Sequence, residues 1–104
     1  MEHPGQKLKR ARERLRLTYR DVGEASQQIA ARRGSDEFAI ALSRLADIEN
    51  KGTVPTIYRF YTLCAIYRLD FHEVLGWYGA PLDQLAADSI HVRIGPTHPI
   101  EISP

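Results

Sequence analysis

Apolar residues recur every three or four positions along most of the chain, and this spacing predicts a set of short amphipathic helices. In the first of them, over residues 5–16, the core stripe consists of Leu8, Ala11 and Leu15. Strong helix formers fill the positions between these residues. The pattern therefore favours an all-α fold.

A second helix begins where Thr18 and Asp21, three residues apart, have the form of an N-cap followed by an acidic residue in the first turn. Its apolar stripe continues until just before Gly34, which can end a helix in the left-handed conformation. We therefore expect a helix over about residues 18–33.

A third helix is predicted over residues 36–49, because the Gly-Ser-Asp break before it supplies a stop and a cap. Phe38 and Leu45 share its apolar stripe. Gly52 can adopt a positive φ beyond its end, and Pro55 prevents its continuation. The polar residues of this stretch point to another face, which makes the helix the candidate binding element: Ser43, Arg44, Asp47 and Asn50.

Two further helices are predicted after this stop. Thr56 caps a helix whose apolar positions recur at spacings of three and four: Ile57, Phe60, Leu63, Cys64 and Tyr67. Residues 70–73 form a capping box that opens a short fifth helix, and Gly76 or Gly79 ends it. The fourth helix is rich in aromatic residues, so we expect it to be largely buried.

The helical signals weaken after the fifth helix. Residues 81–87 are compatible with one or two helical turns that direct Leu82 and Leu85 inward. From residue 89 the chain alternates briefly like a strand and then contains several prolines, so we expect it to be extended. The expected organisation is a helical domain over residues 1–80 and a tail over residues 81–104, partly helical and then extended.

Composition limits the class of protein. The chain has 104 residues, 43% of them apolar, which suits one domain with a small core. No apolar run reaches the roughly 20 residues that cross a bilayer, and the N-terminus does not resemble a signal peptide, so we expect a cytoplasmic protein without membrane contact. With a single cysteine, Cys64, and no spaced nucleophile, carboxylate pair or ligand set, we expect no metal, no cofactor and no enzymatic activity.

The charge is unevenly distributed. Residues 1–34 contain nine Lys/Arg and four Asp/Glu, which is +5, whereas residues 35–104 contain five and nine, which is −4. Such asymmetry suits a protein with one face toward a polyanion. A solvated basic helix gives the same count, so the charge alone does not establish nucleic-acid binding.

The order of these elements resembles the Xre/Cro-like (lambda-repressor-like) helix-turn-helix DNA-binding domains. The resemblance covers about residues 6–78 and rests on Leu8-x-x-x-Arg12, on residues 17–23 (LTYRDVG), on residues 45–55 (LADIENKG-x-x-P) and on the register of residues 57–75. It implies five short helices in which the second and third form the reading unit.

The resemblance also implies roles for individual residues. Arg12 and Glu49 match a structural ion pair that ties the first helix to the end of the recognition helix. Three residues match positions that meet DNA phosphates: Thr18, Tyr19 and Asn50. Four match positions that face base edges in the major groove: Leu42, Ser43, Arg44 and Asp47. Lys51 is a further expected phosphate contact.

One departure from the family is an excess of about a dozen residues around positions 27–40. If helical, these residues elongate the second and third helices and move their tight turn to Gly34. The longer arm can bring Arg32 and Arg33 to a DNA backbone, can clash with DNA, or can serve a protein partner.

The leading hypothesis is a sequence-specific transcriptional regulator that binds double-stranded DNA as a homodimer. The alternative is a protein-interaction module on the same fold, in which the extended helix pair binds a toxin, a sigma factor or a cytoskeletal partner. Single residues leave alternatives open too: Arg44 and Asp47 can form an ordinary i, i+3 ion pair, and Asn50 can be a helix cap.

Overall fold

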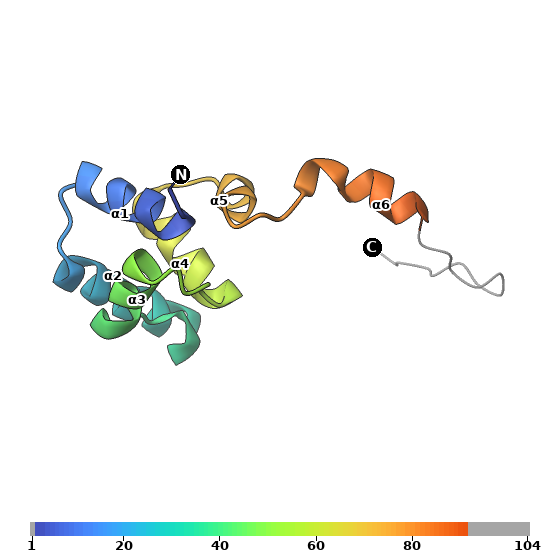
Figure 1. The fold of residues 1–104 in the computed structure, drawn as a ribbon. Coiled ribbons are helices and arrows are strands. Elements are labelled where there is room, and N and C mark those ends of the chain that lie inside the picture. The colour runs from blue at the N-terminus through green and yellow to red at the C-terminus, as the bar shows by residue number, and fades with distance from the viewer. Residues whose placement is uncertain (1, 92–104) are drawn as a thin grey trace.

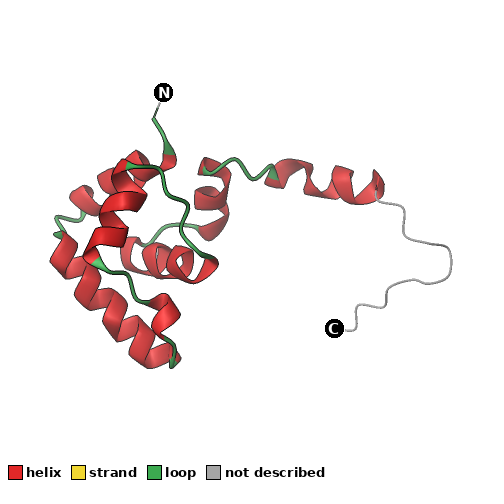
Figure 2. Ribbon diagram, turned by 60° about the horizontal axis from the view of Figure 1, so that its bottom comes forward, coloured by secondary structure: helices red, strands yellow, loops and turns green. Residues whose placement is uncertain are grey.

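The computed structural model describes residues 2–91, and every regular element in this range is a helix (Figures 1 and 2). The prediction of an all-α fold is therefore confirmed for this part of the chain. Six α-helices and two turns of 3-10 helix follow one another: α1 (Pro4–Arg14), α2 (Tyr19–Arg33), η1 (Asp36–Phe38), α3 (Leu42–Asn50), α4 (Ile57–Tyr67), α5 (Phe71–Trp77), η2 (Leu82–Gln84) and α6 (Leu85–His91). Within residues 2–91, none of these helices combines the length and the hydrophobicity that crossing a membrane needs.

The hydrophobic core lies among the first five helices. Each of them contributes at least one fully buried side chain, and the largest of these are Leu8, Val22, Leu45, Ile48, Leu63 and Val74. Burying an aliphatic side chain of this size stabilises a fold by about 1.5–3 kcal/mol. The core therefore joins α1, α2, α3, α4 and α5 into one body.

The second helix has the predicted length and ends. The Thr18 hydroxyl accepts a hydrogen bond from the Asp21 amide at 3.1 Å, and the Asp21 carboxylate accepts one from the Thr18 amide at 2.8 Å. At the other end, Gly34 has φ 71°, in the left-handed region that glycine adopts without steric cost. The capping box and the glycine stop thus fix a helix of 15 residues.

The third helix is shorter than predicted. It begins at Leu42 rather than near residue 36, so the expected elongation is correct for α2 and wrong for α3. Instead, the residues before it form η1 and then an extended stretch over residues 39–41. Phe38 does not continue the α3 stripe, because its ring packs edge-on against Tyr58 and Tyr61 of α4.

The α2–α3 connection, residues 34–41, is held by side chains from the neighbouring helices. The Ser26 hydroxyl accepts from the Ile40 amide at 2.9 Å, and the Thr62 hydroxyl donates to the Phe38 carbonyl at 2.7 Å. Arg59 Nε donates to the Ala39 carbonyl at 3.1 Å. A buried extended segment cannot satisfy its own backbone groups, so these bonds make the connection possible without a helix.

The end of the described chain differs from the prediction in two respects. The α6 helix continues to His91, so an extended conformation from residue 89 onward is wrong for the first three residues of that stretch. Leu85 is 62% exposed and does not turn inward, because α6 projects away from the body and has η2 as its main neighbour (Figure 1). Most of the predicted strand-like alternation, over residues 92–94, lies outside the described residues.

Ser26→Ala should destabilise the fold by about 1–3 kcal/mol, because it leaves the buried Ile40 amide without its acceptor. The midpoint of urea unfolding measures the change. Ser43→Ala, on the exposed face of α3, is the control and should shift stability by no more than about 0.5 kcal/mol. Equal midpoints for the two variants would contradict the role of Ser26.

Candidate nucleic-acid interface

The α3 helix has one face in the core and another in solvent. Leu45, Ile48 and Glu49 are buried, and they fix the rotation of the helix about its own axis. Four of the residues matched to DNA contacts lie on the exposed side: Leu42, Ser43, Arg44 and Asn50. The expected reading face is therefore accessible.

The buried end of α3 is tied to α1 by the Arg12–Glu49 pair. Glu49 is 0% exposed and Arg12 is 12% exposed at their side chains, and Arg12 Nε lies 2.8 Å from Glu49 Oε2. A second guanidinium nitrogen donates to Oε1 at 3.1 Å, and a third donates to the Leu17 carbonyl at 2.9 Å. The hydrogen bonds to Glu49 raise the pKa of Arg12, so its guanidinium remains charged. The structure thus brings together the two residues that the family resemblance pairs.

Tyr19 belongs to the same cluster. Its hydroxyl donates to Glu49 Oε1 at 3.3 Å, and its ring stacks beneath the Arg12 guanidinium, with Cζ 4.7 Å from the ring centroid. Burial and the Glu49 charge raise the pKa of Tyr19, while the Asn50 side chain acts in the opposite direction. Tyr19 is therefore a neutral donor turned toward Glu49, a role that its match to a phosphate position did not indicate.

Tyr67 lies close enough for the charges of this cluster to act on it. Burial and the negative charge of Glu49 raise its pKa, so its hydroxyl remains protonated. Its oxygen is buried without a hydrogen-bond partner among the described residues. Tyr67 therefore adds a neutral, buried hydroxyl beside the Arg12–Glu49 pair.

The two helices can approach because the first turn of α1 contains Gly5. A Cβ atom at this position would lie 2.7 Å from the Glu49 carbonyl oxygen and would collide with the Ile48 carbonyl as well. The Arg12–Glu49 pair therefore joins two helices whose backbones are in direct contact. The sequence shows Gly5 at the start of the predicted first helix, but a glycine alone does not tell which neighbour approaches it.

On the outer face of α3, Asp47 pairs with Lys51 rather than with Arg44. Lys51 Nζ lies 3.5 Å from Asp47 Oδ1, one helical turn away. Arg44 is exposed and makes no salt bridge within the part of the chain that the structure describes. Its guanidinium is therefore available to a ligand, and of the two arrangements left open by the sequence the i, i+3 pair is not formed.

Leu42 lies where α3 meets α2. It is 47% exposed, and its Cδ2 would be 3.0 Å from a Cβ atom on Gly23, so the glycine leaves room for it. A shallow hollow of about 250 Å³ adjoins it and is lined also by Arg20 and Gln27 of α2. Arg20 and Gln27 therefore extend the candidate surface, although neither is among the site residues expected from the sequence.

Thr18 is exposed at the N-terminus of α2, but its backbone amide already donates to the Asp21 carboxylate. Hydrogen bonds from the Thr18 backbone and then from its side chain lower the pKa of Asp21, so this carboxylate is ionised at neutral pH. An anionic ligand at the N-terminus of α2 must therefore lie close to the negative charge of Asp21. The Thr18 hydroxyl, the amides that follow it and the helix dipole remain to attract a phosphate.

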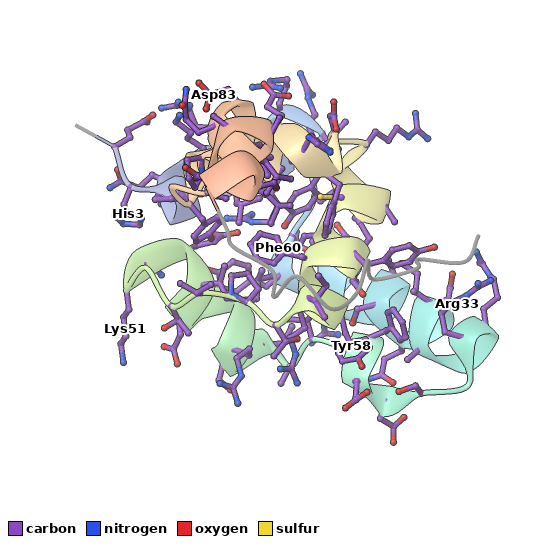
Figure 3. All side chains as sticks on the ribbon, turned by 90° about the vertical axis from the view of Figure 1, so that its right-hand side faces the viewer. His3, Arg33, Lys51, Tyr58, Phe60 and Asp83 are labelled. Carbon is purple, nitrogen blue, oxygen red and sulfur yellow. The ribbon has the colours of Figure 1, made fainter. Side chains whose placement is uncertain are left out.

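Arg32 and Arg33 lie away from the α3 face. They line a groove of about 550 Å³ between α2 and α4, and no α3 residue is among its lining residues. Figure 3 shows Arg33 and Lys51, the C-cap of α3, at opposite sides of the molecule. The structure therefore separates these two arginines from the other residues expected to contact DNA.

Apart from Arg20, which lies in the hollow beside Leu42, several basic residues of the first third also lie away from α3. Lys7, Arg10 and Arg14 line a hollow between α1 and α5, together with Glu73 and Trp77. Lys7 Nζ lies 5.4 Å from the centroid of the Trp77 ring. The uneven charge of the sequence is thus divided among several surfaces.

Comparison of the chain with protein-family models, curated proteins and solved structures gives no match. The function proposed below therefore rests on the residues and their geometry, together with the resemblance noted in the sequence.

A double-mutant cycle should reveal strong coupling between Arg12 and Glu49. Arg12→Met leaves a buried carboxylate without its cation and should cost about 3–5 kcal/mol, measured by urea unfolding. Arg12→Met combined with Glu49→Met removes both charges and should be more stable than Arg12→Met alone. Additive losses would show that the two side chains act independently.

Proposed function

We propose that this protein is a sequence-specific DNA-binding transcriptional regulator that inserts α3 into the major groove of double-stranded DNA. The observation that carries the proposal is the contrast between the two sides of α3. One side is fixed by the core and by the Arg12–Glu49 pair, whereas the other presents Arg44 without an ionic partner among the described residues.

The arrangement of the helices supports a lambda-repressor-like helix-turn-helix as the finer description of the fold. The α2 and α3 helices pack against each other, α1 crosses the end of α3, and α4 and α5 complete the core. The α2–α3 connection is longer than the family's turn, but it stays ordered against α2 and α4 instead of lengthening α3. The first turn of α3 thereby remains exposed, which supports its entry into a groove.

Base readout in this proposal comes from the first turn of α3. Arg44 can donate two hydrogen bonds to guanine, Ser43 can bond a base or a phosphate, and Leu42 can contact a thymine methyl group. Asp47 orients Lys51 rather than Arg44. Of the residues that the sequence assigns to DNA, the geometry favours Leu42, Ser43 and Arg44 for sequence specificity.

Phosphate contacts come from the edges of the same surface. Lys51 and Asn50 are exposed at the C-terminal end of α3, and Thr18 is exposed at the start of α2. Tyr19 contributes by holding Glu49 in place rather than by pointing outward. A dimer places two such surfaces on half-sites about one helical turn of DNA apart.

A protein-interaction module is the second candidate, and one specific observation favours it. The α4 helix and its approach carry several large exposed apolar side chains: Val54, Ile57, Tyr58 and Tyr61. A grouped apolar surface of this kind is typical of a protein interface rather than of a DNA-binding face. The two candidates are compatible if the α4 surface serves assembly and the α3 surface serves DNA.

The proposal is tested by selecting DNA fragments from a random library with the purified protein and measuring their affinity by fluorescence anisotropy. Arg44→Ala should change the selected sequence and weaken binding to the original one by about 1–3 kcal/mol. Lys51→Ala should weaken binding to all sequences similarly and reduce the salt dependence by about one counterion.

Arg14→Ala is the matched control, because it removes one positive charge from the α1–α5 hollow, outside the proposed interface. It should leave the selected sequence unchanged. Binding without sequence preference, or an Arg44→Ala variant that selects the same sequence with the same affinity, would contradict the proposed function.

A further inference from the structure

The α6 helix begins with Leu85, an apolar side chain that the described residues leave largely uncovered. Residues 82–91, which form η2 and α6, extend from the body, and Leu85 is 62% exposed. A helix of this length is marginal in water without tertiary contacts, because nucleating a helix is unfavourable. The α6 segment therefore has the properties of a helix that is stabilised by a partner surface.

A surface of suitable shape lies between α2 and α4. The α2–α4 groove, about 550 Å³, has an apolar floor that includes Ile29, Ile66 and Ala65. It adjoins a more apolar hollow between α4 and α5, of about 470 Å³, and the two share Tyr61 and Ala65. Together they form a solvent-exposed depression that is mostly apolar between α4 and α5 and mixed in polarity between α2 and α4.

Charge complementarity connects this groove with α6. Three arginines border the groove: Arg32, Arg33 and Arg68. Residues 80–91 contain Asp83 and Asp88 and no lysine or arginine. An acidic helix with apolar residues at spacings of three and four thus matches an apolar groove with basic walls.

The structure leaves α6 outside the groove of its own body, which favours docking on a second copy. In the single chain α6 projects away and has η2 as its main neighbour, while the groove between α2 and α4 stays open. A second copy can bring its α6 to this groove without any change in the path of residues 78–81. Figure 3 shows Asp83 and Arg33 at well-separated places on the molecule.

We infer that the protein forms a symmetric dimer in which α6 of each copy occupies the α2–α4 groove of the other. Leu82 and Leu85 enter the apolar floor, and Asp83 and Asp88 face the arginines. Reciprocal exchange fills two grooves at once and doubles the buried area, as an interface of roughly 1,000 Å² or more requires. This inference deepens the dimeric aspect of the proposed function, but the dimer exists without DNA.

Sedimentation velocity of the full chain, without DNA, is the first test. The wild type should sediment as a dimer, and Leu85→Asp should sediment as a monomer with an unchanged circular dichroism melting temperature of the body. Ala87→Asp, one more acidic residue on the same helix but two positions away, controls for added charge and should weaken the dimer less.

Disulfide trapping identifies the partner of α6. Cys64→Ala removes the native thiol, and Ala65→Cys with Ala86→Cys then places one thiol in the groove and one on α6. Mild oxidation should give a covalent dimer on a non-reducing gel. Glu24→Cys with Ala86→Cys is the control, because Glu24 lies in the hollow on the other flank of α2, and it should give little cross-linking.

Each result bears on the inference. A monomeric wild type, a dimer that persists in Leu85→Asp, or a disulfide confined to single chains would overturn it; the last result would show α6 docking on its own body. Failure of the DNA selection with an intact, cross-linkable dimer would reject the proposed function alone. A monomer that still selects a DNA half-site would reject only the exchange.

Discussion

The Arg12–Glu49 pair is the interaction on which the position of α3 depends. Glu49 is fully buried, and a buried carboxylate requires a cation and hydrogen bonds to avoid a large desolvation cost. Arg12 supplies both, and it also bonds the Leu17 carbonyl, so one side chain joins α1, the entry to α2 and the end of α3. Such a pair contributes little net stability compared with apolar residues of the same volume, but it permits one arrangement of the three helices.

The α2–α3 connection fixes the opposite end of α3. Its backbone is bonded by Ser26 from one side and by Thr62 and Arg59 from the other, and Phe38 fills the space between the α4 tyrosines. The connection is therefore part of the packed body. The connection is longer than the turn of the helix-turn-helix domains that the sequence resembles. Its packing explains how it can precede α3 without displacing this helix from α1 and α2.

The sequence predicts correctly those helix ends that depend only on residues close by in the chain. The Thr18 capping box and the Gly34 stop are complete within a few residues, so the bounds of α2 could be inferred from the sequence alone. The start of α3 could not, because Phe38 has helical spacing with Leu45, and the hydrogen bond that holds its carbonyl comes from Thr62 of α4, 24 residues further along the chain. Glu49 and Arg12 were paired only through the resemblance, since nothing local to either residue identifies its partner.

Two side-chain orientations also could not be predicted from the sequence. Tyr19 points toward Glu49, and Asp47 pairs with Lys51 rather than with Arg44. A match to a family position predicts where a backbone lies better than where a side chain points, because the side chain responds to neighbours that differ between proteins. The exposure of Leu85 is a related case: its spacing indicates an apolar face, but spacing does not tell whether the same chain provides the surface that covers it.

The attachment of α3 at both ends has a consequence for the thermodynamics of recognition. A helix already ordered before it meets a ligand loses little conformational entropy on binding, so more of the contact energy appears as affinity. The same rigidity prevents α3 from adjusting to a poorly shaped ligand. In the proposed DNA complex, selectivity is then set by steric and hydrogen-bonding fit, with little contribution from induced folding.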